Sequence, residues 1–178
     1  MNTYYKNIEE KFLAADEMIE VGDVKEAKEL LESIVMEDPT YGRAHNHLGW
    51  IYTVHFSDYK RAERHLKLAL KYAPDYPSGY KNYARLLLDL NKPDDMLELI
   101  NKALLVPGVN KALMFRFMGV AAEMKGDYKT AYKQFRRSHE TSFEEGWFDI
   151  IKEDFKRLRK KVGLASWLVL WLFVKRNA

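Results

Sequence analysis

The sequence predicts an all-α protein built from repeated helix–turn–helix units. Four stretches look alike, and the key small or apolar residue of each recurs at intervals of 35, 34 and 35 positions, at Ala27, Ala62, Met96 and Ala131. A second series of small residues lies upstream at intervals of 34, 35 and 35 positions, at Ala15, Gly49, Ala84 and Gly119. Two independent series that share one period near 34 residues are typical of stacked helix pairs.

Each unit contains the residues that a close pair of helices requires. The small residue of the first helix lets the second helix approach, and a larger side chain on the second helix fills the space that remains. The larger side chains are Leu31, Leu66, Ile100 and Phe135. We therefore expect Gly49 and Gly119 to lie at close contacts between helices.

The ends of the helices are also marked. An aspartate stands at the expected N-cap of three second helices: Asp23, Asp58 and Asp127. Asp23 with Glu26 has the spacing of a capping box, whereas Asn91 and Pro93 replace the aspartate in the third unit. Prolines close the second helices of the first three units, at Pro39, Pro74 and Pro107. Turns within the helix pairs are expected near residues 22, 57, 91 and 126.

With these residues the chain resembles the tetratricopeptide-repeat (TPR) family. The second unit matches the family pattern best and has one extra residue in its turn; its matching residues are Leu48, Gly49, Tyr52, Ala62, Leu66, Ala69 and Pro74. The resemblance covers roughly residues 4–142 and implies a right-handed helical solenoid. It divides residues 1–142 into about four repeats, at 4–40, 41–75, 76–109 and 110–142. The matching residues pack helices and carry no chemistry.

Residues 143–162 are predicted to form an amphipathic capping helix, because the last repeat of an array needs a cover for its apolar face. Large apolar residues recur there at helical spacing: Phe143, Trp147, Ile150, Ile151, Phe155, Leu158 and Val162. The other face carries five basic residues: Lys156, Arg157, Arg159, Lys160 and Lys161. A charged face of this kind is either solvated or placed against anionic lipid.

Residues 163–178 form an apolar tail that starts at Gly163. The 11 residues from Leu164 to Val174 would extend about 16 Å as a helix, whereas a membrane core is about 30 Å thick. Two interpretations remain: the tail packs on protein, in this chain or in a second copy of it, or it lies in a membrane interface. The residues that would make the contact are Trp167, Leu168, Leu170, Trp171, Leu172 and Phe173.

Composition argues against several other classes of function. The 178 residues include no cysteine, so the chain has neither a disulfide framework nor a thiolate metal site. The net charge of +3 is too small to indicate a nucleic-acid partner. The positive excess lies in residues 141–178, which hold eight of the 29 basic and five of the 26 acidic residues. The sequence has no phosphate loop, nucleophile elbow or zinc helix, so we expect no enzyme, metal or cofactor.

In TPR proteins the first helix of each repeat lines a concave groove. Mapped by position, the centre of this groove combines polar side chains with exposed aromatic faces: Asn46, Trp50, Lys81, Asn82, Arg85, Arg116 and Phe117. Amides and guanidinium groups beside aromatic rings suit an extended peptide with a carboxylate. We therefore expect a cytoplasmic scaffold that binds a peptide or protein segment in the groove. The alternatives are a peripheral membrane adaptor and a self-assembling protein that dimerises through its tail.

Overall fold

The computed structural model of the chain is all-α, and it describes residues 3–142, 145–163 and 166–168. The helices are α1 (Thr3–Val21), α2 (Val24–Glu37), α3 (Gly42–Val54), α4 (Tyr59–Tyr72), α5 (Pro77–Asp89), α6 (Pro93–Ala103), α7 (Lys111–Met124), α8 (Tyr128–Thr141) and α9 (Glu145–Val162). Residues 4–142, all of which are described, contain no strand, as the helical repeat predicts.

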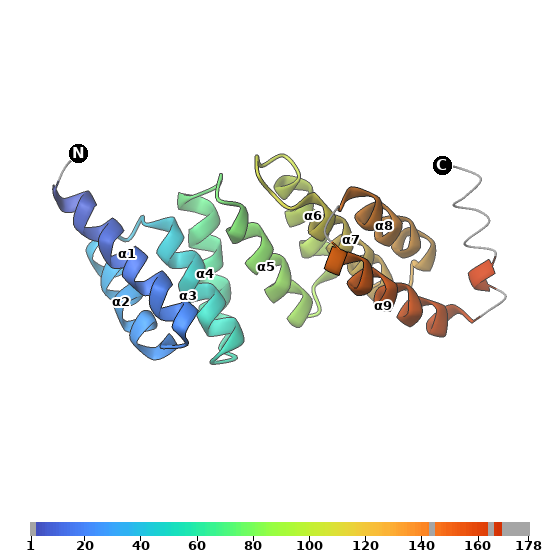
Figure 1. Cartoon of the computed structure of the whole chain (residues 1–178), viewed down its shortest axis with the longest axis horizontal. Helices are drawn as coiled ribbons and strands as arrows, with labels where there is room; N and C mark the ends of the chain where they lie inside the picture. The colour runs from blue at the N-terminus through green and yellow to red at the C-terminus, as the bar shows by residue number, and fades with distance from the viewer. Residues whose placement is uncertain (1–2, 143–144, 164–165, 169–178) are drawn as a thin grey trace. The chain divides into compact units, whose positions relative to one another are not determined.

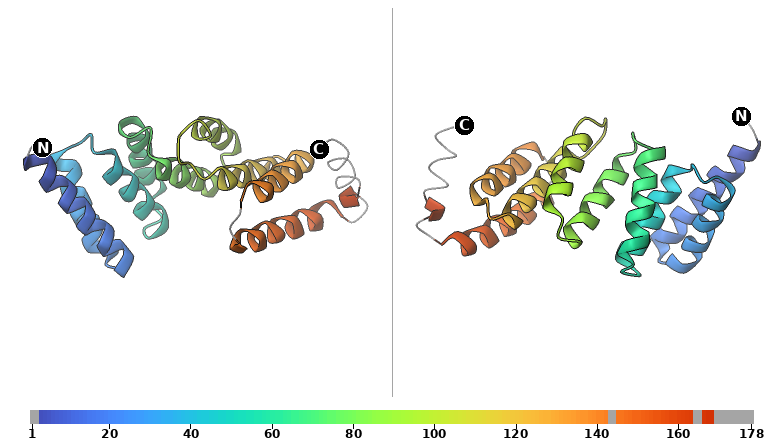
Figure 2. Two further views of the ribbon diagram at one scale, coloured as in Figure 1. Left: turned by 45° about the horizontal axis from the view of Figure 1, so that its top comes forward. Right: turned by 180° about the vertical axis from the view of Figure 1, so that it is seen from behind.

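The helices form two compact units, Met1–Leu86 and Leu87–Ala178, and the boundary falls near the end of α5. In the first unit α1 packs against α2, α2 against α3, and α3 against α4. In the second unit α6 packs against α7, α7 against α8, and α8 against α9. Figures 1 and 2 show the pairs α1–α2, α3–α4 and α7–α8 lying side by side.

The two glycines predicted at close helix contacts lie there. A Cβ atom added to Gly49 would come within 2.5 Å of Cγ of Leu66, and one added to Gly119 within 2.5 Å of Cδ1 of Phe135. Leu66 and Phe135 are both fully buried, so neither side chain has free space into which it can move. The sequence series that contains these glycines therefore marks where the paired helices touch.

One residue in each predicted turn has a left-handed backbone. These residues are Gly22, Ser57, Asn91 and Gly126, with φ of 95°, 51°, 56° and 76°. The following amide closes the turn; in the first unit Asp23 N–H donates to the carbonyl of Met18 at 2.8 Å. In the second repeat the hydrogen bond from the amide of Asp58 to the carbonyl of Tyr52 spans one residue more, because this turn contains the extra residue seen in the sequence.

Two of the three predicted aspartate caps form. The side chain of Asp58 accepts a hydrogen bond from the amide of Arg61, and that of Asp127 accepts one from Thr130, both at 3.0 Å. Asp23 makes no such bond, so the capping box predicted for it is wrong. Asp23 instead lines an open pocket beside the end of α3, where water can solvate its carboxylate.

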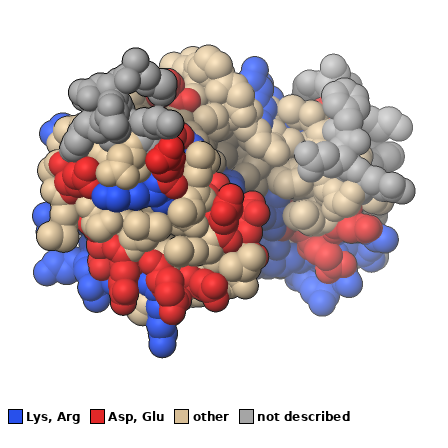
Figure 3. Space-filling model, turned by 60° about the vertical axis from the view of Figure 1, so that its left-hand side comes forward, with Lys and Arg blue, Asp and Glu red and all other residues tan. Residues whose placement is uncertain are grey.

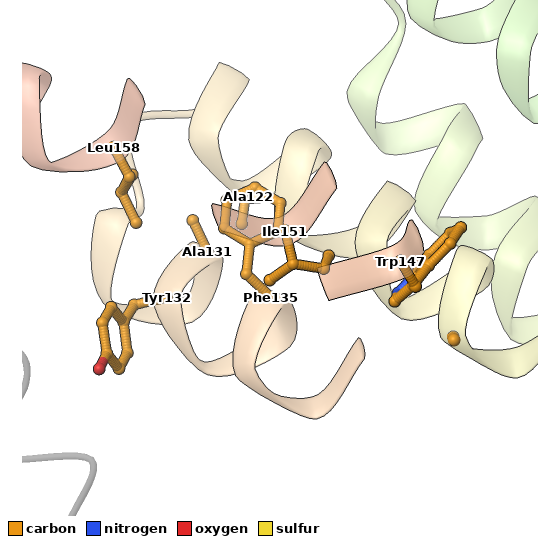
Figure 4. Close-up of a cluster of buried hydrophobic side chains, with 8 residues drawn as sticks. Ala122, Ala131, Tyr132, Phe135, Trp147, Ile151 and Leu158 are labelled. Carbon is orange, nitrogen blue, oxygen red and sulfur yellow. The ribbon is translucent and has the colours of Figure 1, made fainter. Parts of the chain in front are cut away.

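Helix α9 lies against α8 and completes the core of the second unit, as expected of a capping helix (Figure 4). Trp147, Ile151 and Leu158 of α9 are at most 9% exposed and join Ala131 and Phe135 of α8 in one apolar cluster. The cluster removes from water most of the apolar stripe that the sequence predicts on this helix. Ile150, which belongs to the predicted stripe, is instead 42% exposed.

A short relay of hydrogen bonds also joins α9 to α8 and α7. The indole Nε1–H of Trp147 donates to Oγ of Ser138 at 3.0 Å, and that hydroxyl donates to the carbonyl of Ala112 at 2.6 Å. Ser138 is fully buried, so the relay satisfies polar groups that burial would otherwise leave without partners. It therefore adds a directional contact to the apolar packing of the cap.

Candidate binding surface

The first unit contains a pocket of about 180 Å³ between the end of α1, the middle of α3 and the start of α5. Four of the predicted groove residues line it: Asn46, Trp50, Lys81 and Asn82. The rest of the wall comes from Ile19, His47, Tyr76 and Ser78. The structure thus brings together, from two different helices, side chains that the sequence places 36 positions apart.

A second pocket, of about 510 Å³, adjoins the first. It is lined by the turn between α1 and α2 and by the end of α3, where Trp50, His55 and Phe56 contribute rings. Ile19 and Trp50 line both pockets, so the two form neighbouring parts of one groove. The ring of Trp50 packs edge-on against His55 with 5.2 Å between centroids. Phe56, which is 43% exposed, extends this aromatic surface toward solvent.

Asn46 and Asn82 form a hydrogen-bonded pair across the groove. The amide Nδ2 of Asn82 donates to Oδ1 of Asn46 at 3.0 Å and so links α5 to α3. Asn46 is only 2% exposed, so the prediction that its side chain is exposed is wrong. Asn82 is half-buried, and it is the member of this pair that a ligand in the pocket can reach.

His47 is a pocket residue that the sequence reasoning missed. Its Nε2 lies 2.9 Å from Oδ1 of Asp16 on α1, and its Nδ1 lies 3.0 Å from the carbonyl oxygen of Arg43. The ring also packs edge-on against Phe12 at 4.9 Å between centroids. Asp16 is 31 positions away in sequence, so only the packing of α1 on α3 reveals the pair. The only sequence feature that indicates this pair is the repeat register, which aligns α1 with α3.

Lys81 and Arg85 supply exposed positive charge on α5. The two residues are one turn apart and therefore lie on the same face of the helix. Lys81 lines the smaller pocket, while Arg85 is outside the lining of both pockets. Figure 3 views the molecule from the side of the first unit and shows acidic and basic side chains interspersed there. Selectivity for an anionic group would therefore come from the positions of Lys81 and Arg85 rather than from an extended basic surface.

The two predicted groove residues of the second unit are not exposed as the sequence suggests. Arg116 makes a two-pronged ion pair with Asp154 of α9, from Nε to Oδ2 at 2.5 Å and from Nη2 to Oδ1 at 3.2 Å. Phe117 is 5% exposed and presents no aromatic face to solvent. Arg116 is engaged because the capping helix supplies a carboxylate that the repeat pattern does not predict.

Two of the five basic residues on α9 form ion pairs with buried carboxylates of the second unit. Arg157 contacts Glu123 of α7 at 2.7 Å and Asp154 at 2.7 Å, and Lys161 contacts Glu123 at 2.9 Å. Burial alone would raise the pKa of Glu123, but hydrogen bonds from Arg157 and Lys161, with their charges, hold that pKa below its ordinary value. The hydrogen bond to Glu123 likewise raises the pKa of Arg157. These contacts use the charges of Arg157 and Lys161 to hold α9 in place, while their side chains remain 42% and 46% exposed.

The start of the tail docks on the second unit. The ring of Trp167 lies 5.1 Å from that of Tyr132 and 6.0 Å from that of Phe155, measured between centroids. Leu168 is 52% exposed. The remaining predicted contact residues lie outside the described part of the chain: Leu170, Trp171, Leu172 and Phe173.

Two other kinds of site were sought in the described residues. No three His, Cys, Asp or Glu side chains among residues 3–142, 145–163 and 166–168 come together as metal ligands would. None of the helices in these ranges combines the length and the apolar character needed to cross a membrane.

No protein-family model matches the chain, and no curated protein matches its sequence. Solved structures do match its fold. That of PilF from Pseudomonas aeruginosa has a TM-score of 0.71 at 14% identity, covering 99% of this chain and 86% of PilF. A crystal structure of MamA has a TM-score of 0.68 at 21% identity, covering 76% of this chain and 78% of MamA. PilW, described as a widely conserved type IV pilus biogenesis factor, has a TM-score of 0.67 at 21% identity, covering 95% and 84%.

These three are TPR proteins, and the similarity to each extends over most of the chain. At such low identity the comparison speaks to architecture alone. It agrees with the 34-residue period, the left-handed turns and the close contacts at Gly49 and Gly119. The chain therefore has the fold of the tetratricopeptide-repeat proteins, an all-α architecture of helices packed in sequential pairs.

Proposed function

We propose that this chain is a protein-interaction scaffold that binds an extended peptide or protein segment in the groove of its first unit. The observation that carries the proposal is the shared pocket of Asn46, Trp50, Lys81 and Asn82. These four residues were chosen by their positions in the repeat, and they line one concave surface. Its continuation past Ile19 and Trp50 into the larger pocket suits an elongated ligand better than a compact one.

The chemistry of the groove favours a segment that carries a carboxylate. The ammonium of Lys81 supplies a positive charge at the pocket, and Arg85 lies one turn further along α5. The partly buried amide of Asn82 can exchange hydrogen bonds with a peptide backbone, and the indole of Trp50 offers an apolar contact between the two pockets. Charge, amide and aromatic ring together fit an acidic or carboxylate-ended peptide.

A direct test uses a peptide library displayed with free C-termini. A selected peptide is then synthesised as the free acid and as the C-terminal amide, and its affinity is measured by isothermal titration. We expect the double variant Lys81→Ala/Arg85→Ala to bind roughly 10-fold more weakly or worse, because charged hydrogen bonds contribute about 1.5–3 kcal/mol each. Affinity should also fall with added salt, since exposed charges are screened over about 8–10 Å.

The matched control is Lys60→Ala/Arg64→Ala, which removes one lysine and one arginine from exposed positions on α4. This control should bind as the parent chain does, and both variants should keep the parent's helical circular dichroism. If both double variants lost the same affinity for the peptide, the loss would reflect the change in net charge rather than a contact in the groove. If the affinity of a selected peptide changed neither in the Lys81→Ala/Arg85→Ala variant nor with added salt, the peptide would bind elsewhere on the chain.

A further inference from the structure

The contacts of α9 divide its basic residues into two groups with different roles. Arg157 and Lys161 point to buried Glu123 and hold the helix against α7. Lys156 makes an exposed contact of 3.3 Å with Glu153, which contributes little to stability in water. Arg159 and Lys160 are exposed, and the described residues give neither of them an acidic partner. Their charge is therefore not used in holding the fold together.

These outward charges border a pocket of about 510 Å³ at the end of α9. Its wall is formed by Phe155, Lys156, Arg159, Lys160, Gly163 and Trp167. The lining combines three cations with two aromatic rings and includes no carboxylate. A rim whose cations Arg159 and Lys160 have no acidic partner among the described residues, set on an aromatic wall, is suited to an anionic group attached to an apolar body.

The backbone at Gly163 builds this pocket. Gly163 has φ of 77°, which ends α9, and its amide donates to the carbonyl of Arg159 at 3.0 Å. The amide of Trp167 then donates to the carbonyl of Gly163 at 3.0 Å, which ties Trp167 to the end of α9. Trp167 consequently rests on Phe155 and Tyr132, on the same side as the basic rim.

We propose that this pocket binds the phosphate headgroups of an anionic lipid surface, with Arg159 and Lys160 as the main cationic contacts. Trp167 lies at its edge, and indole rings favour the boundary between lipid headgroups and acyl chains. Leu168, the next residue, is 52% exposed. The sequence that follows, from Val169 to Val174, is wholly apolar, and two further cations come after it. A lipid surface uses both kinds of side chain at once, the cations with the headgroups and the apolar side chains at the boundary with the acyl chains.

The proposal goes beyond the peptide groove, which lies in the other unit, so the two can fail separately. The test is flotation of the full chain with neutral phosphatidylcholine vesicles and with vesicles that also contain about 30% phosphatidylserine. We expect binding to the anionic vesicles only. Arg159→Gln/Lys160→Gln should reduce the partition coefficient roughly 30-fold, because each basic residue near such a surface contributes about 1 kcal/mol. Trp167→Ala should weaken binding as well. The size of this loss should depend less on salt than the loss caused by Arg159→Gln/Lys160→Gln, because the indole contributes an apolar contact.

The matched control is Lys60→Gln/Lys133→Gln, which removes the same charge from exposed positions on α4 and α8. It should bind nearly as the parent chain does, and Arg159→Gln/Lys160→Gln should leave peptide affinity in the first unit unchanged. Failure of the parent chain to float with anionic vesicles would overturn the proposal, as would equal losses in the two double variants. A dimer in solution that Trp167→Ala dissociates, without any vesicle binding, would instead assign the pocket to a second copy of the chain.

Discussion

A pair of histidines joins α3 to α4 at the level of single residues. Nε2 of His45 lies 3.0 Å from the carbonyl oxygen of Pro39, which can only accept, so this nitrogen carries a proton. Nδ1 of His45 therefore accepts a hydrogen bond from Nδ1 of His65, 2.9 Å away. Tyr52 stacks on His65 with 5.6 Å between ring centroids. The contact is satisfied when both imidazoles are neutral.

We predict that this pair makes the first unit sensitive to mild acid. Burial lowers the pKa of His45, and burial with the nearby positive charges of His45 and Arg64 lowers the pKa of His65 to about 4. The unfolded chain binds protons at about pH 6.5, so the contribution is full above that pH and is lost as pH falls toward 4. Between pH 7 and 5 we expect a loss of about 1–2 kcal/mol after allowance for partial exposure.

Urea unfolding at pH 7 and pH 5 measures this loss. The comparison is with His65→Asn, whose amide can still donate to His45 but does not titrate. The carboxylates with lowered pKa values, such as Glu32 and Glu9, release little stability until the pH falls below about 4.5, which is why the window ends at pH 5. If His65→Asn lost as much stability as the parent chain between pH 7 and pH 5, the histidine pair would be excluded as the cause.

Among the elements, α9 is held by apolar packing and by a network of buried charge. The apolar cluster around Ile151 and Leu158 removes apolar side chains of α9 from water, whereas the ion pairs add directional contacts to α7. Glu123 is central, since it receives both Arg157 and Lys161. Removing one partner of a buried pair leaves uncompensated charge, and this costs more than the intact pair contributes.

Glu123→Gln is therefore predicted to loosen α9 without unfolding the first unit. We expect a loss of about 2 kcal/mol, below the range for fully buried pairs because Arg157 is partly exposed. Hydrogen exchange followed by mass spectrometry should show faster exchange in residues 145–162 and unchanged exchange in α1–α4. The control is Glu153→Gln, which removes an exposed carboxylate from the same helix and should change stability by less than about 0.5 kcal/mol. Equal exchange in the two variants would contradict a structural role for the Glu123 network.

At the scale of the whole molecule, the chain forms two compact units, and Trp167 of the tail packs against the core of the second. Trp167 closes that core against Tyr132 and Phe155, while the apolar residues after it fall outside the described part of the chain. The structure thus describes the docking of Trp167, whereas the contacts of residues 169–178 stay a prediction. A truncation series can separate these two parts of the tail after Leu168.

We predict that a chain ending at Gly163 melts about 3–6 °C lower than a chain ending at Leu168, because only the longer chain keeps Trp167. The loss of a partly buried indole costs about 1–1.5 kcal/mol, which corresponds to a shift of this size in a protein of such length. Differential scanning calorimetry measures both forms, and mass in solution is recorded beside it. If both truncated chains melted at the same temperature, docking of Trp167 would make no contribution to stability. If ending the chain at Leu168 converted a dimer to a monomer, the remainder of the tail would be the dimer element.

The sequence alone determined the fold, since it depends on local features that a single chain displays in order. A period of 34–35 residues, small residues at Gly49 and Gly119, and turns at Gly22 and Gly126 each reflect the geometry of one helix pair. The pocket was predictable in part for the same reason: repeat positions place Asn46 and Lys81 on the faces of first helices.

Tertiary structure alone decided which charged and aromatic side chains remain available. Arg116, Arg157 and Lys161 look alike in sequence to Lys81 and Lys160, yet the first three contact carboxylates 34 to 38 positions away in the chain. Phe117 and Trp50 are likewise both aromatic residues at predicted inner positions, but the first is buried and the second lines a groove. Helical periodicity tells which face a residue occupies, but not what another helix places against it, because burial and ion pairing depend on contacts between segments distant in sequence.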